Sequence, residues 1–401
     1  METVSAEAVV VGGGPAGLTA AVALASAGMK TALVRGAPRE ADNRTTALLA
    51  GSVKALDTLG AWNACRIHAA PLSILRIIDD TKRLFRAPGV SFDAREIGLE
   101  AFGYNIENTH LVAALEARAA ELPAFHRIDE TVTSLDLNDG GVTVILADAR
   151  RIAARLAIGA DGRNSLTRRA AGIALDSRSY PQTALALNLR HTRPHGNVST
   201  EFHTETGPFT LVPLPGLRCG LVCVVDRRQA DDLLSLDDEA LGREIETRSH
   251  SILGGIAVEP GRGVFPLEMA TARSMVRPRV ALIGEAAHVM PPLGAQGLNL
   301  SLRDAATIGE LVAAAHRAGD DVGSDALLAD YERRRRSDIG TRTFAVDLLN
   351  RSLLTDFLPV QALRGFGLYV MDQIAPLRRA VMREGIAPSA DTPRLMRGEA
   401  L

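Results

Sequence analysis

Residues 280–299 read Val-Ala-Leu-Ile-Gly-Glu-Ala-Ala-His-Val-Met-Pro-Pro-Leu-Gly-Ala-Gln-Gly-Leu-Asn, and this stretch decides the fold. Its apolar beginning, residues 280–283, predicts a short buried strand. The strand ends at Gly284, where the absence of a Cβ allows a turn or the close approach of a ligand. Glu285 then places a carboxylate at the strand tip, which is where ligands bind in open α/β sheets.

The second half of the stretch predicts a loop followed by a helix. Pro291 and Pro292 stiffen the loop, and Gly294 and Gly297 flank the start of a helix that runs through Asn299. A helix N-terminus presents free N–H groups and the positive end of the helix dipole, so it suits a ligand with negative charge. The candidate ligand-binding residues of this stretch are Gly284, Glu285, Gly294, Gln296, Gly297, Leu298 and Asn299.

A glycine-rich motif near the N-terminus predicts a nucleotide site. Residues 8–11 are apolar and predict a strand, and residues 12–17 fit the pattern G-x-G-x-x-G at the start of a helix. Residues 30–34 predict the next strand, which completes a βαβ unit. In such a unit the glycines permit a tight turn, close approach to a pyrophosphate and helix–strand packing. The expected cofactor-binding residues here are Gly12, Gly14, Pro15, Ala16 and Gly17.

These motifs give the chain a resemblance to a known family. The residues Gly284-Glu-Ala-Ala-His, Pro-Pro, Gly-x-Gln-Gly-x-Asn and the later Asp304 resemble the second flavin motif of the FAD-dependent aromatic hydroxylases, the para-hydroxybenzoate hydroxylase-like group. The stretch is most similar to the ubiquinone-biosynthesis hydroxylases of that family. The resemblance implies that FAD is the cofactor, that the acid binds its ribityl chain, and that the helix N-terminus faces the pyrimidine edge of the flavin. Glu285 stands where the family has Asp, and its longer side chain can accept the same hydrogen bond.

Arg35 occupies the end of the second strand, where an acid that binds ribose is expected. One interpretation is that Arg35 accommodates the 2′-phosphate of NADP, which would make this a nicotinamide site. The other is that FAD binds here, with Arg35 donating to ribose or adenine or pointing to solvent. The distant motif at residues 284–299 favours FAD, because a domain that binds only NADP does not require this motif.

Two further residues match positions that contact FAD in the family. Arg44 matches an arginine that reaches the FAD pyrophosphate, where a planar fork of donors suits phosphate oxygens. A surface arginine before a helix is the alternative. Asn108 matches a polar residue near the flavin, just before a helix expected from residue 110 to residue 121.

A third motif follows a strand expected over residues 152–158. It resembles the Asp-Gly motif that serves both FAD and the nicotinamide donor, with Asp161 placed for ribityl or ribose hydroxyls and Arg168 placed for phosphate. The alternative is a turn with a helix N-cap at Asn164 or Ser165.

The order of these patterns predicts an α/β fold (α+β overall). We expect a Rossmann-like FAD-binding domain, an inserted antiparallel-sheet substrate domain and C-terminal helices. A hairpin is expected over residues 131–147, and a strand pair within residues 71–100. The expected FAD-binding domain comprises residues 1–70, 101–180 and 276–343, the substrate domain residues 71–100 and 181–275, and the C-terminal helical segment residues 344–401.

Composition argues against several other classes of protein. The net charge of −2 and the pI of about 6.5 leave no basic excess to neutralise the phosphates of a nucleic acid. Cys65, Cys219 and Cys223 form neither a metal-binding spacing nor an even set for disulfides, which fits a reducing compartment. No signal peptide or spanning helix is apparent, so we expect a cytoplasmic protein.

The C-terminal segment carries apolar stripes with arginines nearby. These could dock the protein on a membrane or on a multi-protein complex, peripheral to the inner membrane, and the alternative is that they pack on the FAD-binding domain. The run of four arginines at residues 333–336 is expected to be a solvated helix face, and Met382 to Gly385 a turn. The stripe residues are Phe344, Leu348, Leu349, Leu353, Leu354, Phe357, Leu358, Phe366, Leu368, Tyr369 and Ile374.

No convincing side-chain nucleophile or acid–base pair stands out, as expected where a flavin carries the chemistry. The resemblance implies a monooxygenase that uses NAD(P)H and O2 to hydroxylate an aromatic ring, here a polyprenylated phenol of ubiquinone biosynthesis. We expect the loop with Pro291 and Pro292 to lie near the flavin. The alternatives are a hydroxylase of a small soluble phenol and a non-catalytic assembly partner. The single Trp62 cannot supply the Trp-x-Trp motif of flavin halogenases.

Overall fold

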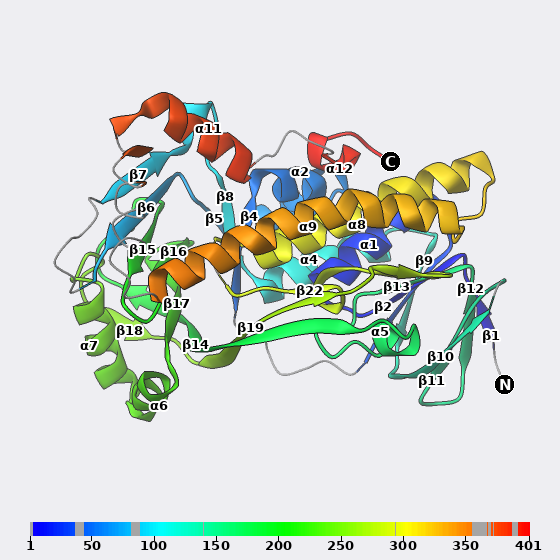
Figure 1. Cartoon of the computed structure of the whole chain (residues 1–401), viewed down its shortest axis with the longest axis horizontal. Helices are drawn as coiled ribbons and strands as arrows, with labels where there is room; N and C mark the ends of the chain where they lie inside the picture. Colours follow the sequence, from blue (N-terminus) through cyan, green and yellow to red (C-terminus); the bar gives the residue numbers. More distant parts are fainter. Residues whose placement is uncertain are drawn as a thin grey trace.

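We describe a computed structural model of the chain (Figure 1). The molecule is elongated, with a parallel sheet and its helices toward one end and a larger mixed sheet toward the other (Figure 1). The structure describes residues 3–36, 44–81, 89–138, 140–292, 294–354, 367, 370–371, 373–386 and 392–401. The expected stripe residues Phe357, Leu358, Phe366, Leu368 and Tyr369 lie outside the described residues.

The first of these sheets has the Rossmann-like form expected for the FAD-binding domain. Its strand order is β20-β21-β13-β2-β3-β9, and every pair except β20–β21 is parallel. Helix α1 packs against α4, α8 and the sheet, and all three helices contribute alanine and leucine side chains to the main core. The elements are β2 (Ala8–Val11), β3 (Thr31–Arg35), β9 (Phe125–Asp129), β13 (Leu156–Gly159), β20 (Val276–Arg277), β21 (Val280–Leu282), α1 (Pro15–Ser26), α4 (Asn108–Ala120) and α8 (Gln296–Ala318).

The prediction of a single strand over residues 152–158 is wrong, because this segment forms two strands. β12 (Arg151–Ala154) joins a four-stranded sheet of order β1-β12-β11-β10, whereas β13 joins the parallel sheet. The exposed Arg155 separates the two strands, and its amide bonds to the carbonyl of Glu7. The expected hairpin is confirmed as β10 (Val132–Asn138) paired with β11 (Gly141–Leu146); β1 is Thr3–Ser5.

The second large sheet has nine strands and contains the expected substrate region. Its main order is β22-β19-β14-β17-β16-β15-β6-β7, and β18 pairs with β14. All of its pairs are antiparallel except β15–β6, which is parallel and departs from the expected antiparallel sheet. The strands are β6 (Ile74–Asp79), β7 (Val90–Asp93), β14 (Leu175–His191), β15 (Val198–His203), β16 (Pro208–Leu214), β17 (Arg218–Asp226), β18 (Ile256–Val258), β19 (Gly263–Ala272) and β22 (His288–Val289).

The two faces of this sheet have different neighbours. Odd-numbered residues of β17, such as Cys219 and Cys223, share one apolar cluster with α6 (Arg227–Ser235) and α7 (Asp238–Arg248). We call this the outer face. Gly220, with the opposite parity, lies against Thr45, so the other face looks toward the part of the chain expected to bind FAD, which contains the parallel sheet. We call it the inner face. A small sheet lies beside it, with β4 (Thr45–Leu49), β8 (Gly103–Glu107) and β5 (Ala69–Pro71), followed by α2 (Ala50–Thr58) after β4.

Helix α9 (Asp325–Leu354) runs along the molecule from the parallel sheet to the nine-stranded sheet (Figure 1). The expected boundary between residues 343 and 344 therefore falls inside a continuous helix. Met382 to Gly385 also lie within a helix, α11 (Ala375–Ile386), and not in the expected turn. The last helix, α12 (Arg394–Arg397), packs on α2 and α8. Within the described part of the chain, no helix is both long enough and apolar enough to cross a membrane.

Candidate active site

Three motifs that lie far apart in the sequence meet at the carboxyl ends of neighbouring parallel strands. Val11 of β2 and Leu282 of β21 both register with Gly159, the last residue of β13, which lies between them. A Cβ built on Gly284 would lie 3.4 Å from the Cβ of Ala16, so the first and second motifs are in contact. This edge of the sheet is where α/β proteins bind nucleotides.

The glycines of these motifs have two distinct roles. Gly12 has a φ of +121°, and a Cβ there would overlap the carbonyl oxygen of Ala160. A Cβ on Gly17 would overlap the carbonyl oxygen of Gly12. By contrast, no heavy atom lies within 4 Å of a Cβ built on Gly14 or Gly297. Gly12 and Gly17 are thus required by packing, whereas Gly14 and Gly297 leave open surface beside two helix starts.

Both helix starts have amide groups that no side chain caps. Gly14, which has no side chain, precedes α1, and Ala295, with a φ of 55° and a methyl group that cannot accept a hydrogen bond, precedes α8. Neither helix has an acidic residue in its first turn. The first-turn amides and the dipoles therefore remain for an anionic group from outside. These two sets of donors, with the open glycine surface beside them, fit the pyrophosphate and flavin ring of FAD.

The loop before α8 is fixed at several points. Pro291 is buried and Pro292 exposed, and Leu293 lies outside the described residues. The Gln296 side-chain amide donates to the carbonyl of Gly294 (2.9 Å). The Gln296 carbonyl oxygen accepts from Arg342 of α9 (2.7 Å), and Leu298 packs against the main core.

Asn299 ties this helix start to the segment that follows Arg44. Its amide oxygen accepts from the backbone N–H of Leu49 (2.8 Å) and the hydroxyl of Ser52 (2.7 Å). Its amide nitrogen donates to the carbonyls of Ala47 (2.8 Å) and Ala295 (2.6 Å). The side chain has no hydrogen-bonding group left over, so Asn299 positions the site by joining α8 to β4 and α2.

Glu285 lies at the tip of β21 with a side chain that is 47% exposed. Its carboxylate is 3.7 Å from Arg163 and is otherwise open to solvent, which leaves it able to accept hydrogen bonds from a ligand. The structure thus places the Glu285 carboxylate at the strand tip, and its binding of the ribityl chain remains a prediction.

Asp161 is engaged within its own turn. Its carboxylate accepts from the hydroxyl of Ser165 (2.5 Å) and from the backbone N–H and hydroxyl of Thr167 (2.9 and 3.1 Å). Ser165 is the N-cap of α5 (Leu166–Ala170) and accepts from the N–H of Arg168. The turn with an N-cap at Ser165 therefore describes this segment, and binding of FAD hydroxyls by Asp161 remains a prediction.

Arg168, expected to meet phosphate, is buried instead. Its guanidinium donates to the carbonyls of Ala286 (3.0 Å) and Arg163 (2.9 Å). It thereby joins the third motif to the second, and its charge faces backbone carbonyls inside the protein.

Arg35 is held by two carboxylates. It forms ion pairs with Glu116 of α4 and with Asp129 of β9, the latter at 2.7 Å. The hydrogen bond to Asp129 raises the pKa of Arg35. Its aliphatic stem lies over Gly13, where a Cβ would come within 2.7 Å of it. Any contact of Arg35 with FAD or with a 2′-phosphate would therefore compete with Glu116 and Asp129, and this contact remains a prediction.

Arg44 lies between the FAD-binding part and the nine-stranded sheet. Its guanidinium carbon is 5.2 Å from the ring centroid of Phe265 on β19. Its carbonyl accepts from the N–H of Asn108 (2.9 Å), and the Asn108 side chain accepts from Thr46 (2.6 Å). The two residues expected near the flavin are thus neighbours.

A buried ionic network lies behind the second motif. Asp304 is 0% exposed and accepts from the amide of Gly284 (3.0 Å), from His288 (2.6 Å) and from Arg335 (2.7 Å). Burial opposes its ionisation, but the charges of His288 and Arg335 outweigh this and hold the pKa of Asp304 below its usual value. Arg335 also pairs with Asp338 (2.6 Å).

This network corrects the expectation for the run of four arginines. The side chain of Arg335 is 2% exposed, whereas those of Arg333, Arg334 and Arg336 are 72%, 37% and 63% exposed. Asp338 continues the network to Arg342 (2.9 Å), which holds Gln296. The sequence places Asp304 in the flavin motif but does not indicate that Arg335 is its partner, because Arg335 lies 31 residues away on another helix.

The inner face of the nine-stranded sheet presents an apolar wall. Ala184 registers with both Phe265 and Val224, so these side chains share the face over which Arg44 lies. Ala184, Val224 and Leu267 form a buried cluster there, with Val222 and Tyr180 packed against it. On the outer face, burial raises the pKa of Cys219 to about 12 and of Cys223 to about 11, so both thiols act as packing groups.

The chain matches a known family over most of its length. Residues 5–344 match the family described as FAD binding domain. The ubiquinone hydroxylase UbiL of Rhodospirillum rubrum is 35% identical, over 99% of this chain and 94% of that protein. The 3-demethoxyubiquinol 3-hydroxylase of Escherichia coli is 30% identical, over 94% of this chain and 97% of that protein.

Solved structures show the same fold. The p-nitrophenol 4-monooxygenase PnpA of Pseudomonas putida has a TM-score of 0.78 at 19% identity, covering 96% of this chain and 98% of that one. A variant of HpxO of Klebsiella pneumoniae, complexed with FAD, has a TM-score of 0.77 at 20% identity and covers 96% and 99% of the two chains. The match over residues 5–344, together with a site that fits FAD, shows that the chain belongs to the FAD-binding-domain family, the family of the flavin-dependent aromatic hydroxylases.

Proposed function

We propose that the chain is an NAD(P)H- and FAD-dependent monooxygenase that hydroxylates a polyprenylated phenol of ubiquinone biosynthesis. The observation that carries this proposal is the match of nearly the whole chain to relatives named ubiquinone hydroxylase UbiL and 3-demethoxyubiquinol 3-hydroxylase. The half-buried Phe265 beside Arg44, with Val222 and Tyr180 around the buried cluster, fits an apolar substrate next to the flavin motifs.

Different residues of the site would bind different parts of the cofactor. The start of α1 at Gly14 to Gly17 would bind the FAD pyrophosphate, with Arg44 as a second contact. Glu285 and Asp161 would accept from the ribityl or ribose hydroxyls, and Asn108 would lie near the flavin. The start of α8 at Gly297 would stabilise negative charge on the pyrimidine side of the ring.

Bound FAD, reduced by NAD(P)H, supplies the oxygen-transfer chemistry with O2. The protein orients the phenol against the cofactor, and the apolar wall keeps water from the reacting atoms. Pro291 and Pro292 would fix the loop that lies between the start of α8 and the strand tips.

The experiment is an assay of product formation by mass spectrometry with FAD-loaded protein, NADPH or NADH, and O2. We expect a polyprenylated phenol to gain one oxygen atom. The matched comparison is the same phenol without its prenyl chain. Coupled hydroxylation of the short phenol alone would overturn the substrate assignment and favour a hydroxylase of small soluble phenols. Tight FAD binding without hydroxylation of either compound would favour the non-catalytic partner.

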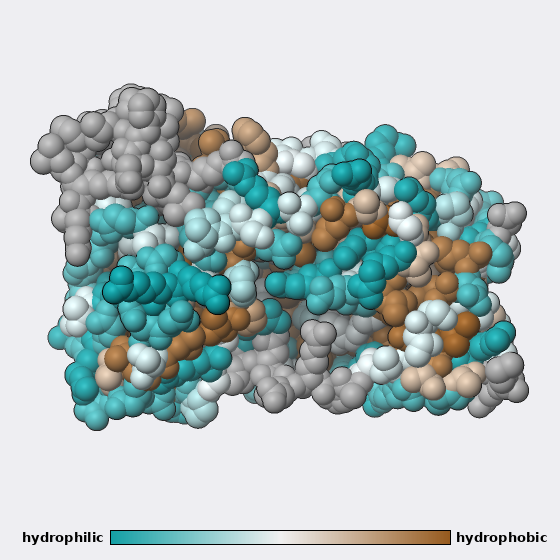
Figure 2. Space-filling view, turned by 60° about the horizontal axis from the view of Figure 1, so that its bottom comes forward, coloured by the Kyte–Doolittle hydropathy of each residue, from teal (hydrophilic) through white to brown (hydrophobic). Residues whose placement is uncertain are grey.

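We also infer a peripheral contact with a membrane surface, which would bring the protein to a lipid-embedded substrate. Apolar side chains are exposed on α9 and α11. For comparison, the hydrophobic residues coloured in Figure 2 form separate patches among hydrophilic ones on the face shown there. Arg379 and Arg383 on α11 could face anionic lipid. Sedimentation with anionic liposomes tests this, and L377E with V381E should weaken it. The exposed large apolar residues of this segment are Phe344 (70%) and Leu348 (57%) on α9, Ile374 (47%) just before α11, and Leu377 (43%) and Val381 (48%) on α11.

A further inference from the structure

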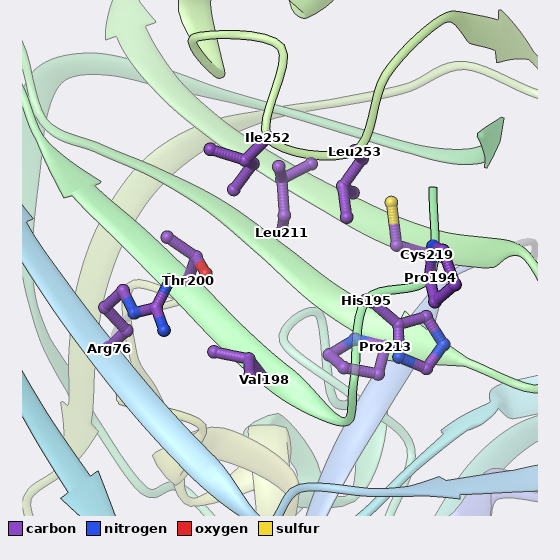
Figure 3. A pocket seen from close by; sticks show the side chains of 10 residues that line it. All are labelled: Arg76, Pro194, His195, Val198, Thr200, Leu211, Pro213, Cys219, Ile252 and Leu253. Carbon is purple, nitrogen blue, oxygen red and sulfur yellow. The ribbon is translucent and has the colours of Figure 1, made fainter. Parts of the chain in front are cut away.

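A cavity of ≈ 230 Å³ lies on the outer face of the nine-stranded sheet, and no flavin motif contributes to it (Figure 3). Leu211 and Cys219 line it, and both belong to the apolar cluster that packs against α6 and α7. Ile252 and Leu253, which follow α7, form its opposite wall. The sheet therefore separates this cavity from the inner face, where the substrate of the flavin reaction is expected.

One end of the cavity carries a positive charge and a hydroxyl group. Arg76 of β6 registers with Thr200 of β15, and Thr200 registers with Leu211 of β16, so the three side chains share one face of adjacent strands. Figure 3 shows the guanidinium of Arg76 directed toward Thr200. Within the described part of the chain, the guanidinium of Arg76 has neither an ion pair nor a hydrogen bond, unlike that of Arg218 on the same sheet, which pairs with Glu107 and Glu259.

The other end of the cavity is closed by uncharged groups. The Nδ1 of His195 accepts from the backbone N–H of Asn197 (3.0 Å), so its Nε2 carries the proton and donates to the carbonyl of Leu214 (3.0 Å). His195 is thus a neutral ring with both nitrogens in use. Val198 lies between this end and Arg76 in Figure 3, and its side chain also lines the cavity.

We propose that this cavity is a second binding site, which takes a small organic carboxylate with an apolar body. The unpaired fork of Arg76 matches the two oxygens of a carboxylate, and the Thr200 hydroxyl can donate to the same group. The apolar walls suit a hydrocarbon body. An apolar cavity of about 150 Å³ holds benzene, so ≈ 230 Å³ has room for a ring and a carboxylate.

Benzoate is the probe, and uncharged benzamide of nearly the same shape is its control. Isothermal titration of the FAD-loaded protein measures binding, and the flavin absorption spectrum is recorded at each point. A molecule in the outer cavity leaves the flavin bands unchanged, whereas one beside the flavin shifts them. Three variants separate the contributions: R76L removes the charge, R76K keeps it without the fork, and V198F fills the cavity while leaving Arg76 in place. R243Q, an exposed arginine change on α7, is the matched control.

We expect the wild type and R243Q to bind benzoate saturably without a change in the flavin bands, and benzamide to bind much more weakly. R76L should weaken binding by roughly 10- to 100-fold, as expected for losing hydrogen bonds to a charged group. R76K should fall between, and V198F should abolish binding while flavin content and the circular dichroism spectrum stay normal. The proposal is overturned if benzoate does not bind saturably, if binding always shifts the flavin bands, or if R76L and V198F bind as the wild type does.

Discussion

Replacing Arg335 by methionine should destabilise the protein far more than any other change in the run of four arginines. The variant R335M keeps most of the side-chain volume but removes the guanidinium 2.7 Å from Asp304, which is 0% exposed and keeps His288 as its other partner. Removing one partner of a buried ion pair costs about 3–5 kcal/mol, because the other charge stays buried. Such a loss is a large part of the roughly 5–15 kcal/mol that stabilises a typical domain.

The assay is equilibrium unfolding in urea, followed by circular dichroism with and without FAD. R336M is the matched control, because Arg336 is the next residue on the same helix and its exposed pair with Glu332 should contribute no more than about 1 kcal/mol. FAD should also bind R335M more weakly, since Asp304 holds the amide of Gly284 beside Glu285. Equal losses of stability in R335M and R336M, at unchanged denaturant slope, would refute the reasoning.

Three other positions give predictions of their own. G12A should fail to fold or to bind FAD, because its Cβ would overlap Ala160. G14A should fold normally by circular dichroism and should lose FAD affinity in a fluorescence titration. Equal folding of the two variants would contradict the packing role of Gly12. Cys219 and Cys223 should resist alkylation of the native protein at pH 8, because burial raises their pKa values to about 12 and about 11, and rapid labelling detected by mass spectrometry would contradict their burial. The pKa of Asp304 is lower in the folded protein than in the unfolded chain, so its ionised form stabilises the fold above the unfolded pKa of about 3.9. The difference in free energy of unfolding between wild type and D304N should therefore shrink as the pH falls below that value. A difference that grows would show that the pKa of Asp304 is raised on folding.

The parts of the fold that the sequence predicted are those governed by local rules. The glycines at residues 12–17 require a tight turn wherever they occur, so β2 and α1 could be placed from the pattern. The same holds for Ser165, whose N-cap to Arg168 spans three residues. The start of α8 followed from its flanking glycines for the same reason.

The parts that could not be predicted depend on contacts between distant residues. Arg35 is paired with residues 81 and 94 positions away, and nothing in the strand that ends with it indicates those partners. Arg335 and Arg336 are identical in type and adjacent, and only the packing of α9 on α8 makes one buried and the other exposed. The split between β12 and β13 likewise arises because the two strands pair in different sheets.

The most direct test of the flavoenzyme assignment is the visible absorption spectrum of the purified protein, recorded without oxygen before and after addition of NADPH or NADH in the presence of a polyprenylated phenol. We predict oxidised-flavin bands that bleach on addition of the reduced nicotinamide, and faster bleaching with the phenol than without it. Absence of flavin bands after incubation with excess FAD would contradict the assignment, and would show that the pairing of Arg35 with Glu116 and Asp129 does not leave a working dinucleotide site.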